Sequence, residues 1–136
     1  MEKIENMTIS GKRKTAVAKL RVKPGSGKVF FNHVPSSELS LFHKLAISEP
    51  LKIYEQILGH IKNDFYVNVH GGGKSSQIQA ARLAIARVLV KISQSDVLRK
   101  AIISYDRNML VQDSRRKETR KPGDSKARAK RQKSYR

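Results

Sequence analysis

The chain has 136 residues, a formal net charge of +18 at pH 7 and no cysteine. This length predicts one domain with a tail, and the lack of cysteine excludes disulfides and thiolate zinc sites. The charge predicts an anionic partner, and a membrane is a poor candidate because no stretch approaches the roughly 18 apolar residues that span a bilayer.

The first predicted element is a strand over residues 14–23, in which apolar side chains alternate with lysine and arginine. Residues 24–27 predict a turn, and residues 28–32 predict the returning strand of a hairpin. Positions 11–28 contain no acidic residue, whereas a face evolved only for solubility usually mixes signs. The pattern therefore favours contact with an RNA or DNA backbone through the following cations: Lys12, Arg13, Lys14, Lys19, Arg21, Lys23 and Lys28.

Two helices are predicted after this hairpin. Pro35 and the serines that follow it precede a short first helix. Ser48 is the predicted N-cap of a second helix, with Glu49 and Pro50 in its first turn and Gly59 at its end. The expected apolar sides are Leu39, Phe42 and Leu45 in the first helix and Leu51, Tyr54, Ile57 and Leu58 in the second.

The next segment predicts a strand, a glycine break and the longest helix of the chain. Residues 64–70 alternate as a strand, and residues 71–73 are three glycines. Apolar side chains then recur at steps of three and four over residues 76–93, which predicts an amphipathic helix. Ser76 and Gln79 have the spacing of a capping box at its start.

Two more elements complete the predicted body. A helix begins at Ser95 or Asp96, and residues 109–111 predict a last short strand. Strands mixed with helices in a short chain indicate an α/β or α+β sandwich, in which a small mixed sheet packs against helices.

The three glycines, followed by Lys74 and Ser75, invite comparison with a P-loop, but the spacing is wrong. The P-loop pattern needs glycine at position 68, where this chain has Asn68. The loop is also too short to wrap a triphosphate, so nucleotide hydrolysis is not expected. Backbone N–H groups at a helix N-terminus, with Lys74 and Ser75 beside them, predict contact with one phosphate of a polynucleotide.

The sequence predicts no catalytic site, no metal and no cofactor. Acidic residues are few and scattered, so a general acid–base pair has little to draw on. Histidines without ligand spacing are ordinary surface or core-edge residues. We therefore expect a binding protein rather than an enzyme, and the four histidines concerned are His33, His43, His60 and His70.

The last 23 residues, 114–136, predict an extended basic tail after a globular domain over residues 1–113. The tail has eleven lysines and arginines against Glu118 and Asp124, a net of +9 and half of the charge of the chain. It holds too little apolar surface to offset the entropy of ordering, so it should be disordered alone. The basic side chains expected to bind RNA are Arg115, Arg116, Lys117, Arg120, Lys121, Lys126, Arg128, Lys130 and Arg131.

A known family shares an ordered set of motifs with nearly the whole chain. The motifs are Gly11-Lys12-Arg13-Lys14-Thr15-Ala16-Val17-Ala18, the PG-x-G-K turn at 24–28, Glu49-Pro50-Leu51, Gly71-Gly72-Gly73 with Gln77, the run 80–87, Asp106-Arg107 and the final KARAKRQKSYR. Together they resemble the family of the ninth protein of the small ribosomal subunit (S-nine). The ending RQKSYR is similar to the archaeal and eukaryotic branch, and the compact N-terminus favours an archaeal source. The chain departs from the family at Ser76, where glycine is common.

The resemblance implies a fold related to the second domain of ribosomal protein S-five, with a left-handed βαβ crossover. It implies a place in the head of the small subunit, in the cytoplasm, bound to ribosomal RNA beside neighbouring ribosomal proteins. It also implies that the tail reaches the tRNA in the peptidyl site (P-site). The residues that would lie nearest to that tRNA are Lys133, Ser134, Tyr135 and Arg136.

One other binding class stays open: a basic architectural protein of DNA or chromatin. The sequence lacks a helix-turn-helix pattern, zinc spacing or a basic zipper. A comparison of affinity for folded ribosomal RNA and for duplex DNA at the same salt concentration would separate the two.

Overall fold

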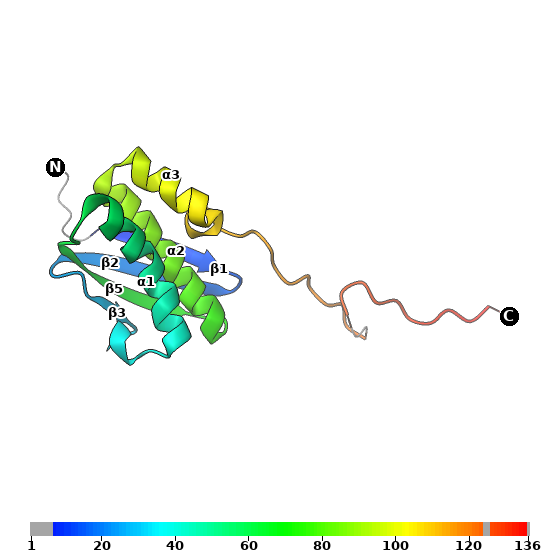
Figure 1. Ribbon diagram of the computed structural model, residues 1–136. Coiled ribbons are helices and arrows are strands. Elements are labelled where there is room, and N and C mark those ends of the chain that lie inside the picture. The colour runs from blue at the N-terminus through cyan, green and yellow to red at the C-terminus, as the bar shows by residue number, and fades with distance from the viewer. Residues whose placement is uncertain (1–6, 124–125, 136) are drawn as a thin grey trace.

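The computed structural model of the chain describes residues 7–123 and 126–135, and Figure 1 shows its architecture. A five-stranded sheet of order β1-β2-β5-β3-β4 carries three helices on one face. This confirms the predicted α+β sandwich of a small mixed sheet against helices. In chain order the elements are β1 (Thr8–Arg13), β2 (Ala16–Pro24), β3 (Val29–Phe31), β4 (Val34–Pro35), α1 (Leu41–Leu58), β5 (Asn63–His70), α2 (Lys74–Ser93) and α3 (Asp96–Tyr105), with 3₁₀ turns at Ser36–Glu38 and Arg107–Met109.

The chain topology places β5 in the middle of the sheet. β2 pairs with β1 and with β5 in antiparallel fashion, whereas β3 pairs with β5 in parallel. α1 makes the parallel connection. In Figure 1 β3 and β5 run toward the right, and α1 crosses in front of the sheet from β3 to β5 above it. A crossover of this sense is left-handed, the opposite of nearly all βαβ units.

The core lies between the inward face of the sheet and α2. Ala16, Ala18, Leu20 and Val22 of β2 have 0% exposure, as the alternation of that strand predicts. The predicted apolar stripe of α2 is also buried, from Ile78 through Leu89. α1 packs against α2, so the long helix is covered on both sides.

Gly11 of β1 lets α2 approach the sheet at close range. A Cβ at this position would lie 2.9 Å from the backbone nitrogen of Ala84 and even closer to the carbonyl oxygen of Ala80. Such separations are shorter than van der Waals contact, and both partners are helix backbone, which cannot move alone. The glycine is therefore required by packing and not by its dihedral angles.

We expect Gly11→Ala to lower the free energy of unfolding by about 1–3 kcal/mol, the usual range for overpacking. Urea unfolding followed by circular dichroism measures this change. Gly73→Ala is the matched control, because nothing lies within 4 Å of a Cβ built there. Equal stability of the two variants would contradict the packing role of Gly11.

The N-terminal strands differ from the prediction in two ways. β1 precedes the strand that the sequence indicates, and Lys14 and Thr15 form the turn between them, with Lys14 at a φ of 51°. Residues 28–32 do not return beside β2 as a hairpin, because β5 lies between β2 and β3. Strand alternation identifies a strand but not its partner, and only the complete sheet decides the pairing.

The two helices predicted before residue 59 are one helix, α1, with Pro50 buried inside it. Ser48 is not a cap: its hydroxyl donates to the carbonyl oxygen of Leu45 at 2.8 Å. Pro50 has no N–H to donate, but the helix continues through this position, where Pro50 is buried in tertiary packing. Phe42 and Leu45 are 81% and 46% exposed, so the apolar side expected for the first helix is wrong as well.

Two further details correct the prediction for the second half, and a third confirms it. α2 begins at Lys74 with Gly73 as N-cap and no side-chain cap, so the capping box of Ser76 and Gln79 is absent. Residues 109–111 form no strand, since Arg107–Met109 is a 3₁₀ turn with Met109 buried. α3 is as predicted, and the Ser95 hydroxyl accepts from the backbone N–H of Leu98 at 3.4 Å.

Candidate nucleic-acid interface

The outward face of the sheet carries a row of cations on β2. Lys19, Arg21 and Lys23 are exposed there, while the residues between them point into the core. No helix covers this face in Figure 1, because all three lie on the other side of the sheet. A fixed strand with cations about 7 Å apart can meet successive phosphates of a polynucleotide.

The other predicted cations of the N-terminal half do not extend this row. Lys12 is exposed on β1, whereas Arg13 turns toward the helix layer, where its Nε donates to Gln79 at 2.7 Å. Lys14 lies in the β1–β2 turn, and Lys28 lies in the β2–β3 connection at the opposite end of β2. The three consecutive cations Lys12, Arg13 and Lys14 therefore lie in three different places: on β1, against the helix layer and in the β1–β2 turn.

The glycine loop before α2 packs against the β1–β2 turn. Gly71 and Gly72 have φ of 71° and 67°, and a Cβ at Gly71 would lie 2.7 Å from the carbonyl oxygen of Thr15. Gln77 closes the loop by donating from Nε2 to the Gly71 carbonyl at 3.1 Å. The glycines thus serve a tight connection, and exposed Lys74 and Ser75 stand at the first turn of α2.

The tail leaves the body at the same end, beside the β1–β2 turn. Figure 1 shows the chain after α3 extending away from the body toward the C-terminus. We call residues 113–117 the tail root. A cleft of about 660 Å³ between the tail root and the turn is lined by Arg13, Lys14, Thr15, Arg115, Arg116 and Lys117.

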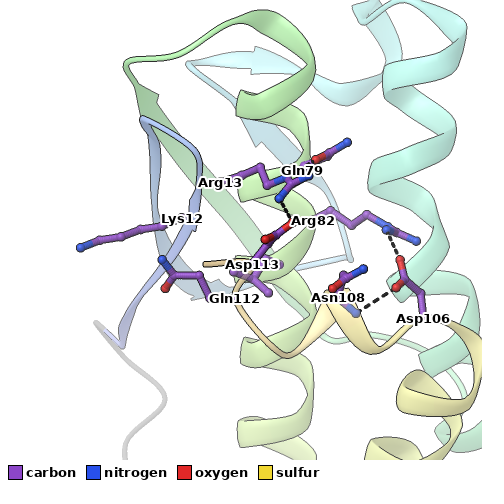
Figure 2. Close-up of a pocket in the computed structure, with 9 residues that line it drawn as sticks. Lys12, Arg13, Gln79, Arg82, Asp106, Asn108, Gln112 and Asp113 are labelled. Carbon is purple, nitrogen blue, oxygen red and sulfur yellow. Dashed lines mark hydrogen bonds and ion pairs between the residues drawn. The ribbon is translucent and has the colours of Figure 1, made fainter. Parts of the chain in front are cut away.

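Asp113 anchors the tail root to the body, and Figure 2 shows its carboxylate beside Arg13. Asp113 forms an ion pair with Arg13 and accepts from Arg115 Nη2 at 2.7 Å and from the Arg115 backbone N–H at 2.8 Å. The hydrogen bonds from Arg115, and after them the one from Arg13, hold the pKa of the Asp113 carboxyl well below its usual range. Arg116 adds a bond from Nη1 to the Lys14 carbonyl at 2.8 Å.

Two arginines of α2 bind the segment that precedes the tail root. Arg87 donates from Nε to the Leu110 carbonyl at 3.0 Å and from Nη1 to the Ser10 carbonyl at 3.2 Å. Arg82 pairs with Asp106 at 2.7 Å and also with Glu49 of α1. Both side chains therefore hold the body together, and the charge of Arg82 is paired with two carboxylates of the protein.

We expect Asp113→Ala to release the tail root without unfolding the body. The variant removes the shared acceptor of Arg13 and Arg115, so the Arg115 amide should move on the nanosecond timescale that free termini show. ¹⁵N relaxation of the full chain measures this, with Glu118→Ala as control because Glu118 bonds to another residue of the tail, Arg128, at 3.0 Å. An Arg115 amide equally mobile in parent and variant would contradict the anchor.

The lowered pKa of Asp113 also gives the sign of the pH dependence of this anchor. A carboxyl whose pKa is depressed by the fold keeps its contribution above its unfolded pKa and loses it as the pH falls through the folded pKa. The Arg115 amide of the parent should therefore stay ordered from pH 7 down to the ordinary aspartate pKa of about 4.

The remaining predicted cations lie along the tail. Within 118–123 and 126–135 the chain forms no helix or strand, and its basic side chains are exposed, while Ala127 and Ala129 are half-buried. Arg128 pairs with Glu118, which folds part of the tail back on itself. Arg120, Lys121, Lys126 and Lys130 are exposed, as are Lys133, Ser134 and Tyr135, whereas Arg136 lies outside the described residues.

Two negative observations concern other kinds of site. Among the residues that the structure describes, no group of three or more histidine, cysteine or acidic residues could hold a metal ion. No helix within the same residues has the length and apolarity that crossing a bilayer requires.

Comparison with known proteins decides the family. The model of the family described as Ribosomal protein S9/S16 matches residues 11–136. The chain belongs to this family. Membership supports a structural role in the small ribosomal subunit, associated with ribosomal RNA and ribosomal proteins, rather than an enzymatic one.

Individual members of the ribosomal family are similar in sequence to this chain over nearly its full length. The small ribosomal subunit protein uS9 of Desulfurococcus amylolyticus is 43% identical over 136 residues, which cover 99% of this chain and 96% of the relative. The protein of the same name from Picrophilus torridus is 43% identical over 128 residues, or 93% and 94% of the two chains. That of Methanococcus vannielii is 41% identical over 129 residues, or 93% and 95%. The archaeal sources agree with the branch that the chain ending indicates.

Sequence reasoning missed several residues of this region that the ribosomal family motifs do not single out. Asp113 was not predicted, because a lone acid before a basic run shows no partner in sequence. Phe30 and Tyr66 were not predicted either, although both stand on the outward sheet face, with Tyr66 between Arg21 and Phe30. Alternation in β5, with Phe65 and Val67 inward, could have placed Tyr66 outward.

Proposed function

We propose that this chain binds ribosomal RNA in the head of the small subunit while its tail extends to the tRNA in the P-site. The observation that carries the proposal is the one-signed row of Lys19, Arg21 and Lys23 on a sheet face that no helix covers. Such a row suits a phosphate backbone, because each cation can replace a condensed counterion.

A second group of contacts is proposed at the end of the body where the tail begins. Lys14, Lys74 and Ser75 lie on loops and a helix start that meet there, and Arg116 and Lys117 line the same cleft. Lys12 and Lys28 flank the sheet row. The tail would follow the RNA with its remaining cations, which are Arg115, Arg120, Lys121, Lys126, Arg128, Lys130 and Arg131.

Arg13 is the weakest member of the predicted RNA-binding set. Its guanidinium is bonded to both Gln79 and Asp113, so it holds the tail root rather than offering a free charge. Arg13 also lines the basic cleft, where it would add positive charge to the interface.

The reach of the tail supports its proposed role. Twenty-three extended residues span at most about 75 Å, so a body on the outside of an RNA assembly can place its last residues deep inside. Tyr135 is the only aromatic residue of the tail, so contacts would be made mainly to phosphates. The tRNA-proximal residues would be Lys133, Ser134, Tyr135 and Arg136.

Neighbouring proteins of the subunit head would contact the start of α1. Leu41 is 66% and Phe42 81% exposed, and Leu45 lies one turn further on the same helix. Large apolar side chains in water at adjacent positions are typical of a surface that a protein partner covers.

As part of a ribosome, the protein would be located in the cytoplasm.

Sedimentation tests the proposal directly. Small subunits washed at high salt to remove this protein should take it up again, and an excess of duplex DNA at the same salt should not compete. Equal competition by duplex DNA would favour the alternative of a basic architectural DNA-binding protein.

A further inference from the structure

One row of residues crosses all five strands on the outward face of the sheet. Arg21 of β2 is directly opposite Tyr66 of β5, and Tyr66 is directly opposite Phe30 of β3. The row ends at Thr8 in β1 and Pro35 in β4. Its three central members have flat side chains, so planar groups stand side by side in the middle of an uncovered sheet face.

The geometry of the central pair leaves one aromatic face available. The rings of Phe30 and Tyr66 are stacked, with centroids 5.0 Å apart and an angle of 7° between their planes. Lys23 places its Nζ 5.1 Å from the centroid of the Tyr66 ring. Lys23 comes from β2 and Phe30 from β3, on opposite sides of β5, so the ring of Phe30 and the ammonium group of Lys23 approach Tyr66 from opposite sides.

An ammonium group is an exchangeable cover for an aromatic ring. A cation–π contact at an exposed site is worth only about 0.5–1 kcal/mol, and the lysine side chain has several free rotations. A planar base gains more by stacking on the same face, and the released ammonium can then pair with a phosphate.

The surroundings of this row select the kind of ligand. A hollow of about 460 Å³ contains both rings, and among its described lining residues there is no carboxylate. Asp64 of β5, directly opposite Lys23, does not line this hollow, and its Oδ1 accepts from the backbone N–H groups of Ser26 and Lys28 at 2.9 Å. The exposed Asn68 offers an amide for the edge of a base.

We propose that an unpaired RNA nucleotide stacks on Tyr66, on the face that Lys23 covers in the free protein. Lys23 and Arg21 then pair with the phosphates on either side of that nucleotide. Bases in a duplex are stacked and paired and cannot enter, so the ligand is a loop or a bulge. The proposal rests on the proposed RNA-binding function and deepens it, because it assigns base stacking to a surface otherwise expected to contact only phosphates.

The test uses the full chain and two RNA hairpins that differ only in their loops. Both have the same stem and the same six-nucleotide loop backbone, but one loop carries bases and the other is abasic. Because the phosphates are equal, the contribution of the tail and of all other cations cancels in the ratio of the two affinities. We expect the parent to bind the loop with bases about five-fold tighter or more, which corresponds to stacking of one base.

Variants test whether the preference for the loop with bases depends on Tyr66. Tyr66→Phe keeps the ring and should keep the preference, whereas Tyr66→Ala should reduce the ratio to about one. Tyr105→Ala is the matched control, since Tyr105 is 60% exposed on α3 in the helix layer and should leave the ratio unchanged. Lys23→Met, which leaves both rings in place, should weaken binding of the abasic loop without lowering the ratio.

The outcomes separate the two proposals. A ratio of about one in the parent, with binding that still weakens as salt is raised, overturns the stacking site and leaves the RNA-binding function standing. A preference that survives Tyr66→Ala in folded protein also overturns it. Failure of both hairpins to bind at low salt would remove the RNA-binding function itself.

Discussion

Small subunits carrying a chain that ends at Gln132 are expected to assemble nearly normally but to hold P-site tRNA less tightly. The deletion removes the side chains of residues 133–136, two of which are cations, and leaves the body and the rest of the tail in place. The lost lysine and arginine would each have gripped phosphate oxygens of the tRNA. Filter binding of tRNA to purified subunits with mRNA measures the change, with incorporation followed by sedimentation.

The length of the tail needs its own control in this experiment. A chain in which Lys133 and Arg136 are replaced by glutamine keeps the length and removes the charge. It should lose tRNA affinity about as much as the deletion. If subunits with the shortened tail retain tRNA as tightly as the parent across magnesium and salt conditions, the tail is only an assembly anchor. Retention by the glutamine variant alone would show that the length of the tail matters and the two charges do not.

Charge reversal on the sheet face should weaken RNA binding with the fold intact. Lys19→Glu with Arg21→Glu places two carboxylates among the exposed positions of β2, where they repel phosphates. The salt dependence should fall too, because each lost phosphate contact removes about 0.7–0.9 from the slope of log K against log salt. Affinity for ribosomal RNA measured at several salt concentrations gives both quantities.

A control of equal charge separates the sheet face from net charge. Lys52→Glu with Lys100→Glu makes the same change on α1 and α3, in the helix layer. Both lysines are exposed, so neither replacement should disturb the core. Equal losses of affinity in the two double variants would show that only net charge matters, and the assigned face would then be wrong.

The basic face of β2 could be predicted from sequence because a strand fixes side-chain direction locally. Successive side chains of an extended chain point to opposite faces whatever the rest of the protein does. The 0% exposure of Ala18 and Leu20 and the exposure of Lys19 and Arg21 follow from this rule alone. The long helix α2 was predictable for the same reason, since its apolar stripe reports its own period.

The interruption of α1 was predicted wrongly because a local signal was outweighed by packing. Ser48, Glu49 and Pro50 have the residue types of a helix start, yet the helix runs through them. The cost of one missing hydrogen bond at Pro50 is offset where the residue is buried against its neighbours. Sequence shows the cost but not the packing that offsets it.

The proposed site also combines features that local sequence determines with features that depend on the tertiary structure. The sequence by itself determined the alternating strand, the amphipathic α2 and the concentration of positive charge in residues 114–136, because period and composition are local properties. Only the tertiary structure decided that β5 separates β2 from β3, which brings Tyr66 between Arg21 and Phe30. It also decided that Arg13 meets Asp113, 100 positions away. Pairings of this kind depend on which distant segments bury each other's apolar surface, and no local pattern contains that information.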